Sequence, residues 1–326
     1  MTTSVRIMGL CKRDDASQTG SVQKRSVRAA VVLAGDDGRC FEVFVRRFQG
    51  HVPPNQDGAL CGTQSLFDWT FRRVERLIPP DRVITVVSRG HFRYHDVCRE
   101  LGRRPKDTVV VQPQNKDTAP ALLLSLTYLR QRHTDAFVAV FPSNHYVIDD
   151  RALMAGVETA FRHVERHPDV VVLLGVEPDW LECDYGYIVP GAPIGGEEPS
   201  DVRSVSHFIE KPSRREAADL IQQGALWNTS ILVFRLGTLL DFMWRTAPLL
   251  PLAFTEIAEA IGTPREYEVM EAVYEDVPPV NFSHGVLESV ADEWPSSLAV
   301  LRVAGAAWSD WCDERRILRS RCKEGA

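Results

Sequence analysis

The chain has 326 residues, of which 44% are hydrophobic and 25% are charged, as in an ordinary globular protein. This composition excludes a disordered or low-complexity chain, and the length suits one large domain or two domains of about 150 residues. The net charge is −6 and no long basic block is present, so we expect no binding to nucleic acid.

The apolar runs and the cysteines indicate the environment of the chain. No apolar run approaches the roughly 20 residues that a membrane span needs, so we expect no membrane association. The seven cysteines contain no C-x-x-C pair, which argues against a disulfide framework and a structural zinc site. Residues 1–26 are polar and show no apolar core of a secretory signal, so we expect a loosely ordered extension and a cytoplasmic protein.

From residue 27 onward, short apolar runs alternate with amphipathic stretches. The apolar runs predict strands and the amphipathic stretches predict helices. Near-continuous apolar strands separated by helices are typical of a mostly parallel, doubly wound sheet with both faces covered. We expect strands at 27–34, 83–87, 109–112, 137–141 and 170–176, and helices at 66–77, 94–101, 119–132 and 151–167.

Beyond residue 180 the pattern indicates a partly antiparallel half of the same α/β domain, which we expect to span 27–320. The Gly- and Pro-rich stretch 190–199 reads as a surface loop because structured patterns resume on both sides. Strands are expected at 185–189, 202–210, 231–234 and 299–303, and helices at 214–223, 236–245, 252–260 and 313–319.

The residues that follow each strand are where a ligand is expected, since ligands bind at the carboxyl ends of parallel strands. The first strand leads into a turn that contains Gly35, Gly38 and Arg39. Glycines let backbone N–H groups approach a phosphate, and an arginine adds positive charge. The same residues also suit a simple tight turn, so this pattern alone leaves both interpretations open.

Two further strands end in polar clusters. The strand at 109–112 leads into Gln112, Asn115 and Lys116, which suit hydrogen bonds to a nucleobase or phosphate, although a plain N-capped helix explains the segment equally well. The strand at 137–141 leads into Ser143 and Asn144. A carboxylate at this place suits Mg²⁺ between phosphates, but the residue present is a neutral amide.

Four later segments combine an aromatic side chain with a small or charged one, as sugar-binding sites do. Each is also explained as a core residue next to a turn. The segments are 185–188, 208–212, 227–229 and 308–311.

Taken in order, these segments resemble the sugar-1-phosphate nucleotidyltransferases, and among them the mannose-1-phosphate guanylyltransferases. Glu210-Lys211-Pro212 matches that family's E-K-P, and Trp308-Ser309-Asp310 matches its W-S-D. Residues 112–121 resemble the family's N-K-G-T-A-P-A loop, and residues 141–145 resemble its F-P-S-D-H motif. Residues 185–188 resemble its G-Y-I motif, and residues 227–228 resemble its W-N motif. Residues 281–283 and 286–288 fit the segment that precedes W-S-D.

The resemblance implies a fold of the nucleotide-diphospho-sugar transferase type, without the C-terminal β-helix of longer members. It implies that GTP and mannose-1-phosphate, or a related sugar phosphate, give GDP-mannose and pyrophosphate with the help of Mg²⁺. A homodimer is the oligomeric state that we keep open.

The resemblance also assigns roles to individual residues. Arg39, Lys211 and Asp310 are the implied catalytic residues, and Asp310 with Asn144 the implied metal ligands. The implied nucleotide-binding residues are Gly35, Gly38, Gln112, Asn115, Lys116 and Ser143, and the implied sugar-phosphate-binding residues are Tyr185, Gly186, Glu210, Lys211 and Asn228.

Several positions depart from the family pattern, and they motivate an alternative function. Cys40 stands in place of the catalytic arginine, Asn55 in place of a phosphate-binding lysine and Asn144 in place of the metal-binding aspartate, while Asp36 and Asp117 replace glycines. The alternative is a catalytically impaired homologue that binds a sugar phosphate or nucleotide sugar as a regulatory or partner protein. A third interpretation, a glycosyltransferase, would need a D-x-D pattern after a strand, and none is present.

Overall fold

The structure, a computed structural model, describes residues 27–34, 66–194, 201–311 and 315–316, apart from the side chains of Leu66 and Asp96. The predicted extension at 1–26 and the predicted phosphate turn with Gly35, Gly38 and Arg39 lie outside these residues, as do Cys40 and Asn55. Most of the helix predicted at 313–319 lies outside them too.

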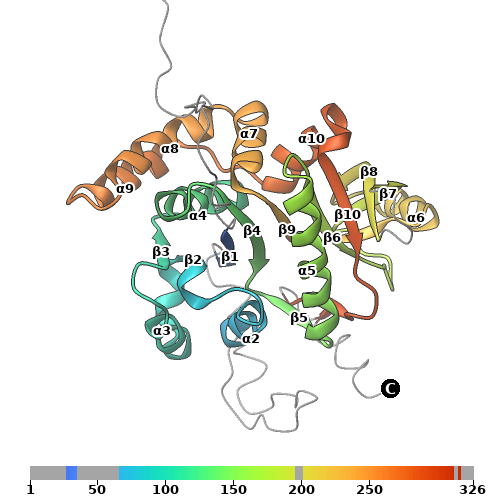
Figure 1. Cartoon of the computed structure of the whole chain (residues 1–326), viewed down its shortest axis with the longest axis horizontal. Helices are drawn as coiled ribbons and strands as arrows, with labels where there is room; N and C mark the ends of the chain where they lie inside the picture. Colours follow the sequence, from blue (N-terminus) through green and yellow to red (C-terminus); the bar gives the residue numbers. More distant parts are fainter. Residues whose placement is uncertain (1–26, 35–65, 195–200, 312–314, 317–326) are drawn as a thin grey trace, which may run out of the picture.

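Within the described residues, nine strands form one mixed sheet in the order β3-β2-β1-β4-β9-β6-β10-β8-β7 (Figure 1). The N-terminal strands β3, β2, β1 and β4 are parallel, and β9 runs antiparallel to both β4 and β6. The strands are β1 Val27–Ala34, β2 Val83–Ser88, β3 Val109–Gln112, β4 Ala136–Pro142, β6 Val171–Val176, β7 Gly186–Pro193, β8 Val202–Glu210, β9 Leu226–Arg235 and β10 Leu298–Arg302.

Helices cover both faces of this sheet. Alternate residues of β1 belong to two different hydrophobic clusters: Ala29 and Val31 pack on one face, and Ala30 and Val32 on the other. The first face carries α4 Thr118–Arg132, α7 Leu236–Thr246, α8 Leu249–Ala260, α9 Glu266–Asp276 and α10 Glu288–Glu293. The second carries α2 Leu66–Val74, α3 His95–Gly102, α5 Asp150–Arg166 and α6 Arg214–Gln222.

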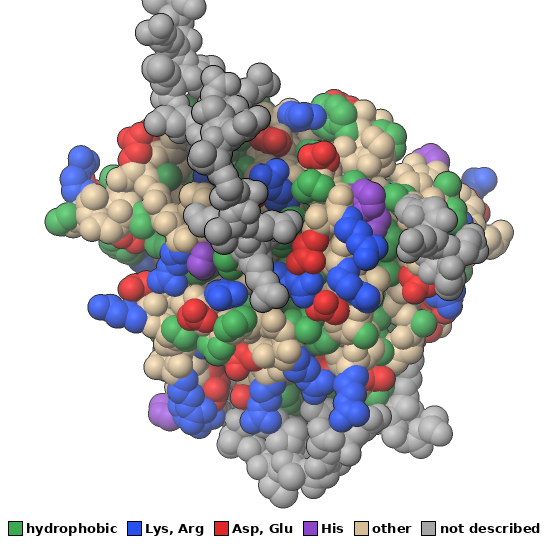
Figure 2. Space-filling model, viewed as in Figure 1, with side chains coloured by type: hydrophobic (Ala, Val, Ile, Leu, Met, Phe, Trp, Pro, Cys, Tyr) green, Lys and Arg blue, Asp and Glu red, His purple; other side chains and the backbone are tan. Residues whose placement is uncertain are grey.

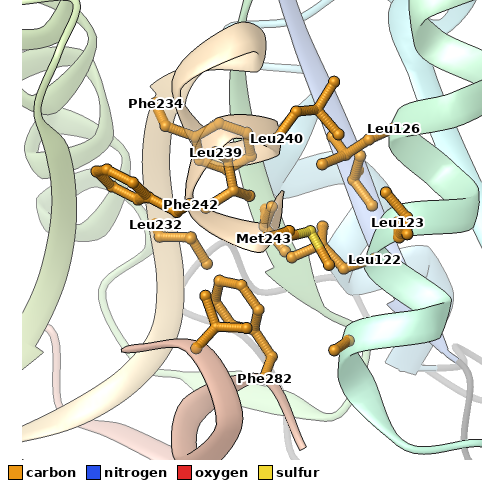
Figure 3. Close-up of a cluster of buried hydrophobic side chains, with 14 of the residues drawn as sticks. Leu122, Leu123, Leu126, Leu232, Phe234, Leu239, Leu240, Phe242, Met243 and Phe282 are labelled. Atoms are coloured by element: carbon orange, nitrogen blue, oxygen red, sulfur yellow. The ribbon is translucent and has the colours of Figure 1, made fainter. Parts of the chain in front are cut away.

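The core on the first face lies mainly between α4 and α7. Figure 3 shows Leu122, Leu123 and Leu126 of α4 on one side and Leu239 and Met243 of α7 beside them. Because α4 is buried on nearly all sides, its sequence is almost uniformly apolar in the middle and lacks an alternating polar face.

A second, two-stranded sheet pairs β5 His145–Val147 with β11 Trp308–Asp310 in antiparallel register, with Asp310 opposite His145. Aromatic rings hold this small sheet in place. Tyr146 stacks on Trp311 with ring centroids 4.1 Å apart, and Trp69 of α2 packs edge-on against the same tryptophan at 5.7 Å. The sequence did not predict these two strands because each is only three residues long.

The predicted elements and fold class are confirmed in outline, with three differences. The 190–199 segment is not a loop throughout, since β7 continues to Pro193 through irregular pairing with β8. The strand predicted at 231–234 begins earlier, so Trp227 and Asn228 lie within β9. Helices α9 and α10 were not predicted, because the sequence of α9, EYEVMEAVYED, has no strong apolar periodicity and α10 is only six residues long.

Charge on the surface is mixed rather than segregated. On the face shown in Figure 2, Lys and Arg side chains are interspersed with Asp and Glu side chains. Among the residues described, no helix combines the length and the apolar character that crossing a membrane requires.

Candidate active site

A cavity of about 600 Å³ opens where β1 and β4 end. This is the edge of the sheet at which the sequence predicted the ligand. Five of the predicted site residues line the cavity, and they come from four separate segments: Asn115, Ser143 with Asn144, Asn228 and Asp310.

The inner wall of the cavity is apolar. It includes Leu122 of α4, Leu232 of β9 and Phe282, which Figure 3 shows within the α4–α7 cluster. The wall is therefore part of the hydrophobic core, and packing fixes its shape. Such a rigid apolar wall with a few polar groups is typical of a small-molecule site.

The loop before α4 forms one side of the cavity. Asp117 caps the helix, since its Oδ1 accepts hydrogen bonds from the backbone N–H of Thr118 at 2.6 Å and from Nδ2 of Asn281 at 3.2 Å. The hydroxyl of Thr118 accepts a bond from the N–H of Phe282 at 2.8 Å. Asp117 has a φ of 70°, a conformation that favours glycine, which explains why the related pattern has glycine there.

Two predicted nucleotide-binding residues near this loop lie outside the cavity lining. Gln112 is buried at the end of β3, in register with Ser88 of β2. Nζ of Lys116 lies 3.5 Å from the carbonyl oxygen of Glu275 at the end of α9. Their roles stay predictions.

The segment after β4 joins the cavity to the small sheet. The N–H of Ser143 donates to the carbonyl of Leu33 at 2.9 Å, which fixes the segment against β1. The carbonyl of Asn144 accepts a bond from the N–H of Trp311 at 2.9 Å. These bonds and the pairing of β5 with β11 bring Asn144 and Asp310 to the same rim of the cavity.

His145 lies at the base of this rim and is buried, with its ring edge-on to Trp308 at 5.1 Å. Burial and the nearby cation of Arg73 hold the pKa of His145 well below its ordinary value. Arg73 is itself buried and pairs with Asp150 at 2.6 Å. The imidazole is therefore neutral at physiological pH, which favours the structural interpretation of this histidine.

Asp310 has a buried cationic partner. Nη1 of Arg316 donates to Oδ1 of Asp310 at 2.8 Å, and its Nη2 donates to Asp184 at 3.0 Å. The guanidinium also lies 3.4 Å from Glu182 and stacks over the ring of Tyr185 at 4.5 Å. Sequence reasoning missed Arg316, because nothing in the segment after W-S-D distinguishes it from neighbouring charged residues.

The oxygen atoms of Asn144 and Asp310 suit Mg²⁺, a hard cation that proteins bind through one or two carboxylates plus substrate phosphates. Among the described residues, no group of three or more His, Cys, Asp or Glu side chains could hold a metal ion by itself. The residues present therefore fit a magnesium ion that phosphate oxygens help to bind.

The predicted sugar-side residues Gly186, Glu210 and Asn228 are neighbours. Gly186 opens β7 and pairs with Glu210, the last residue of β8. A Cβ atom on Gly186 would lie 2.5 Å from Oε2 of Glu210 and 3.4 Å from Cβ of Asn228. Because Gly186 has no side chain, the Glu210 carboxyl can occupy this space. The exposed Lys211 follows in a left-handed conformation, φ 51°, and its N–H donates to Tyr185.

Glu210 is surrounded by other acidic groups. Burial raises its pKa to about 7, Glu288 and Asp117 add to the rise, and Lys211 with the hydroxyl of Ser283 opposes it. Glu288 also accepts a hydrogen bond from the N–H of Glu210 at 2.8 Å. Sequence reasoning placed 281–283 and 286–288 in the family pattern but assigned them no role, since the contact appears only once α10 packs on β8.

Comparison with known proteins decides the family. The nucleotidyl transferase family model matches residues 59–310. The chain belongs to the nucleotidyl transferase family. The match covers most of the chain and all of the predicted motifs from residue 112 onward, and it confirms the resemblance seen in the sequence.

Individual members of the nucleotidyl transferase family are similar over most of this chain. Mannose-1-phosphate guanylyltransferase ManC of Salmonella typhimurium is 24% identical over 284 residues, 86% of this chain and 56% of ManC. Alginate biosynthesis protein AlgA of Pseudomonas syringae pv. tomato is 26% identical over 286 residues, 86% of this chain and 55% of AlgA. This chain thus spans about half the length of the curated relatives it matches.

A solved structure supports the fold as well. The crystal structure of mannose-1-phosphate geranyltransferase from Thermus thermophilus superposes with a TM-score of 0.71 at 26% identity, covering 90% of this chain and 79% of that one. The predicted nucleotide-diphospho-sugar transferase type of α/β fold is therefore confirmed.

Proposed function

We propose that this nucleotidyl transferase joins GTP and mannose-1-phosphate to give GDP-mannose and pyrophosphate. The observation that carries the proposal is the cavity at the ends of β1 and β4, which gathers predicted polar side chains from four segments and adjoins the Gly186–Glu210 pair. The similarity to ManC, a mannose-1-phosphate guanylyltransferase, supports guanine as the base and mannose as the sugar.

The reaction moves a guanylyl (GMP) group from pyrophosphate to the phosphate of the sugar. A phosphate oxygen of the sugar phosphate attacks the α-phosphorus of the triphosphate, the bond to the bridging oxygen of the β-phosphate breaks, and pyrophosphate leaves. No proton needs to be abstracted from an ionised phosphate. The task of the protein is therefore to align two anions and to offset their charge.

The described residues divide this task between two sides of the cavity. Asp310 and Asn144 would hold Mg²⁺, which supplies charge neutralisation between the phosphates when it is bound. Glu210 and Asn228 would recognise the hydroxyl groups of the sugar, and Lys211, which follows Glu210 in the chain, would offset the charge of its phosphate. Gly35, Gly38 and Arg39 stay predicted phosphate contacts. A cytoplasmic location stays a prediction, and a homodimer stays an open alternative.

The test is pyrophosphate release from the purified chain. Four nucleoside triphosphates (GTP, ATP, UTP and dTTP) are each paired with mannose-1-phosphate and with glucose-1-phosphate in the presence of Mg²⁺, with EDTA as a control. We expect turnover to be fastest with GTP and mannose-1-phosphate and to stop with EDTA. Absence of pyrophosphate from every pair, with protein that circular dichroism shows to be folded, would contradict the proposal.

A further inference from the structure

Arg316 is a buried cation at the rim of the cavity, and it contacts three carboxylates from two parts of the chain. It bonds to Asp310 at 2.8 Å and to Asp184 at 3.0 Å, and it lies 3.4 Å from Glu182. Only 7% of its side chain is exposed, and the ring of Tyr185 lies beneath the guanidinium. An arginine held on several sides in this way has little freedom to move aside.

The position of Arg316 affects the electrostatic energy of a metal ion at the rim of the cavity. Asp310 is a carboxylate lining the cavity, and Arg316 places a full positive charge 2.8 Å from one of its oxygens. A bare divalent cation that approaches Asp310 is attracted by the carboxylate and repelled by the guanidinium. The carboxylates of Asp184 and Glu182, which also contact the guanidinium, add to the attraction, and the positive charge of Arg316 offsets part of it.

A metal ion that arrives with a nucleoside triphosphate meets a different balance. The metal–triphosphate complex carries net negative charge, so the guanidinium attracts the complex although it repels the bare ion. The same arginine thus disfavours the free metal and favours the metal–nucleotide complex.

We propose that Arg316 is a positioning residue that holds the Asp310 carboxylate and keeps the metal affinity of the free protein low, so that the divalent ion binds together with the triphosphate. This inference rests on the proposed function, because it takes Asp310 as the metal ligand. It assigns to Arg316 a role in the order of binding.

The test is a titration of the full chain with Mn²⁺ in the absence of nucleotide, followed by the electron paramagnetic resonance signal of the free ion. Arg316→Met removes the charge, and Arg316→Gln removes the charge while keeping N–H donors for Asp310. We expect both variants to bind Mn²⁺ at least about tenfold more tightly than wild type, whereas Arg316→Lys stays close to wild type.

The direction of the change separates this role from a merely structural one. If Arg316 only packed β11 in place, its loss would loosen Asp310 and weaken metal binding. Unchanged or weaker Mn²⁺ binding in both uncharged variants, with thermal unfolding showing that at least one is folded, would therefore overturn the proposal.

Double variants identify the carboxylate that gains the metal. The tighter binding must disappear in R316Q/D310N and persist in R316Q/D184N, which is the matched control. Persistence in R316Q/D310N would overturn the proposal, because the ion would then be held by the other carboxylates.

Pyrophosphate release is measured separately from Mn²⁺ binding, so the results can contradict one proposal without contradicting the other. Turnover by wild type without tighter Mn²⁺ binding in the variants overturns the role of Arg316 alone. Tighter binding that depends on Asp310, without turnover by wild type, supports that role and contradicts the proposed reaction.

Discussion

Two carboxyl groups, Asp310 and Glu210, each end a strand beside the same cavity, and their surroundings are opposite. Asp310 has a buried arginine 2.8 Å away. Glu210 is buried with Glu288 and Asp117 nearby, and its pKa is raised to about 7 because burial outweighs the attraction of Lys211. Asp310 thus forms an ion pair with a buried cation, whereas Glu210 gains or loses its proton near neutral pH.

The difference shows how one cavity can treat a metal and a sugar differently with the same functional group. A carboxylate paired with a cation stays an acceptor, which suits a metal or a cationic neighbour. A carboxyl that titrates near neutral pH can donate or accept a hydrogen bond, which suits hydroxyl groups. The arrangement divides the proposed site into a metal side and a sugar side.

The largest expected effect on activity comes from a change at the metal side of the cavity. Asp310→Asn removes the carboxylate that is proposed to bind Mg²⁺, and we expect kcat/KM for pyrophosphate release to fall by about two orders of magnitude or more. The overall fold should persist, because Arg316 keeps its bond to Asp184. Loss of less than about tenfold, at saturating Mg²⁺, would show that Asp310 does not hold the metal in the reaction.

The next prediction concerns the proton on Glu210. Its carboxyl ionises near its ordinary value of 4.5 in the unfolded chain and near 7 in the folded protein. Protonated Glu210 therefore stabilises the fold at low pH, and this contribution is lost as the pH rises through about 7. Glu210→Gln removes the titration, so the free energy of unfolding of E210Q relative to wild type should rise by up to about 3 kcal/mol between pH 4.5 and about pH 8.

Urea unfolding of both proteins across this pH range measures the difference. A difference that stays constant with pH would mean that Glu210 titrates normally, and the contrast with Asp310 would disappear. Glu288→Gln is a useful companion, since removing that neighbour should shift the rise to lower pH.

A smaller effect is expected from the space beside Glu210. A Cβ on Gly186 would lie 2.5 Å from the Glu210 carboxyl, so Gly186→Ala forces that side chain to move. We expect KM for the sugar phosphate to rise by about tenfold, with little change in KM for the nucleotide, since only the sugar side is disturbed. Equal changes in both constants would contradict the division into two sides.

The smallest effect serves as a reference for stability. Ser213 caps α6 directly after the E-K-P segment and forms a reciprocal capping box with Glu216. Ser213→Ala should lower the free energy of unfolding by about 1 kcal/mol without changing either KM. A change in KM for the sugar phosphate would show that the position of Glu210 depends on the start of this helix.

Most of the main sheet could be predicted from sequence because its strands are buried on both faces. The apolar runs of β1, β2 and β6 agree with the predicted ranges to within one residue at each end, since their composition leaves little other placement. The three-residue strands β5 and β11 could not be predicted, because their pairing depends on tertiary contacts and not on a local pattern.

The candidate site was predicted in part for the same reason. Asn115, Ser143 and Asn144 follow apolar parallel strands, so their convergence follows from topology. Asn228 reaches the same edge because it lies near the start of β9, which runs antiparallel to β4. Asp310 is brought there by the pairing of β11 with β5. The partners that set their electrostatics are different. Arg316 lies on a segment without a distinctive pattern, and Glu288 lies on a segment of the family pattern to which no role was assigned. Their contacts exist only because β11 pairs with β5 and α10 packs on β8.

The pairing of β5 with β11 also has a consequence for folding. It joins residue 145 to residue 310 and so closes a very long loop, which costs chain entropy that is recovered only after the intervening sheet has formed. We therefore expect Asn144 and Asp310 to meet late in folding, after the hydrophobic core has assembled. A species that has collapsed but lacks this pairing would contain the core without the site. A ligand that binds at this rim would bind only the fully folded protein, and it would stabilise that state by mass action over partly folded species.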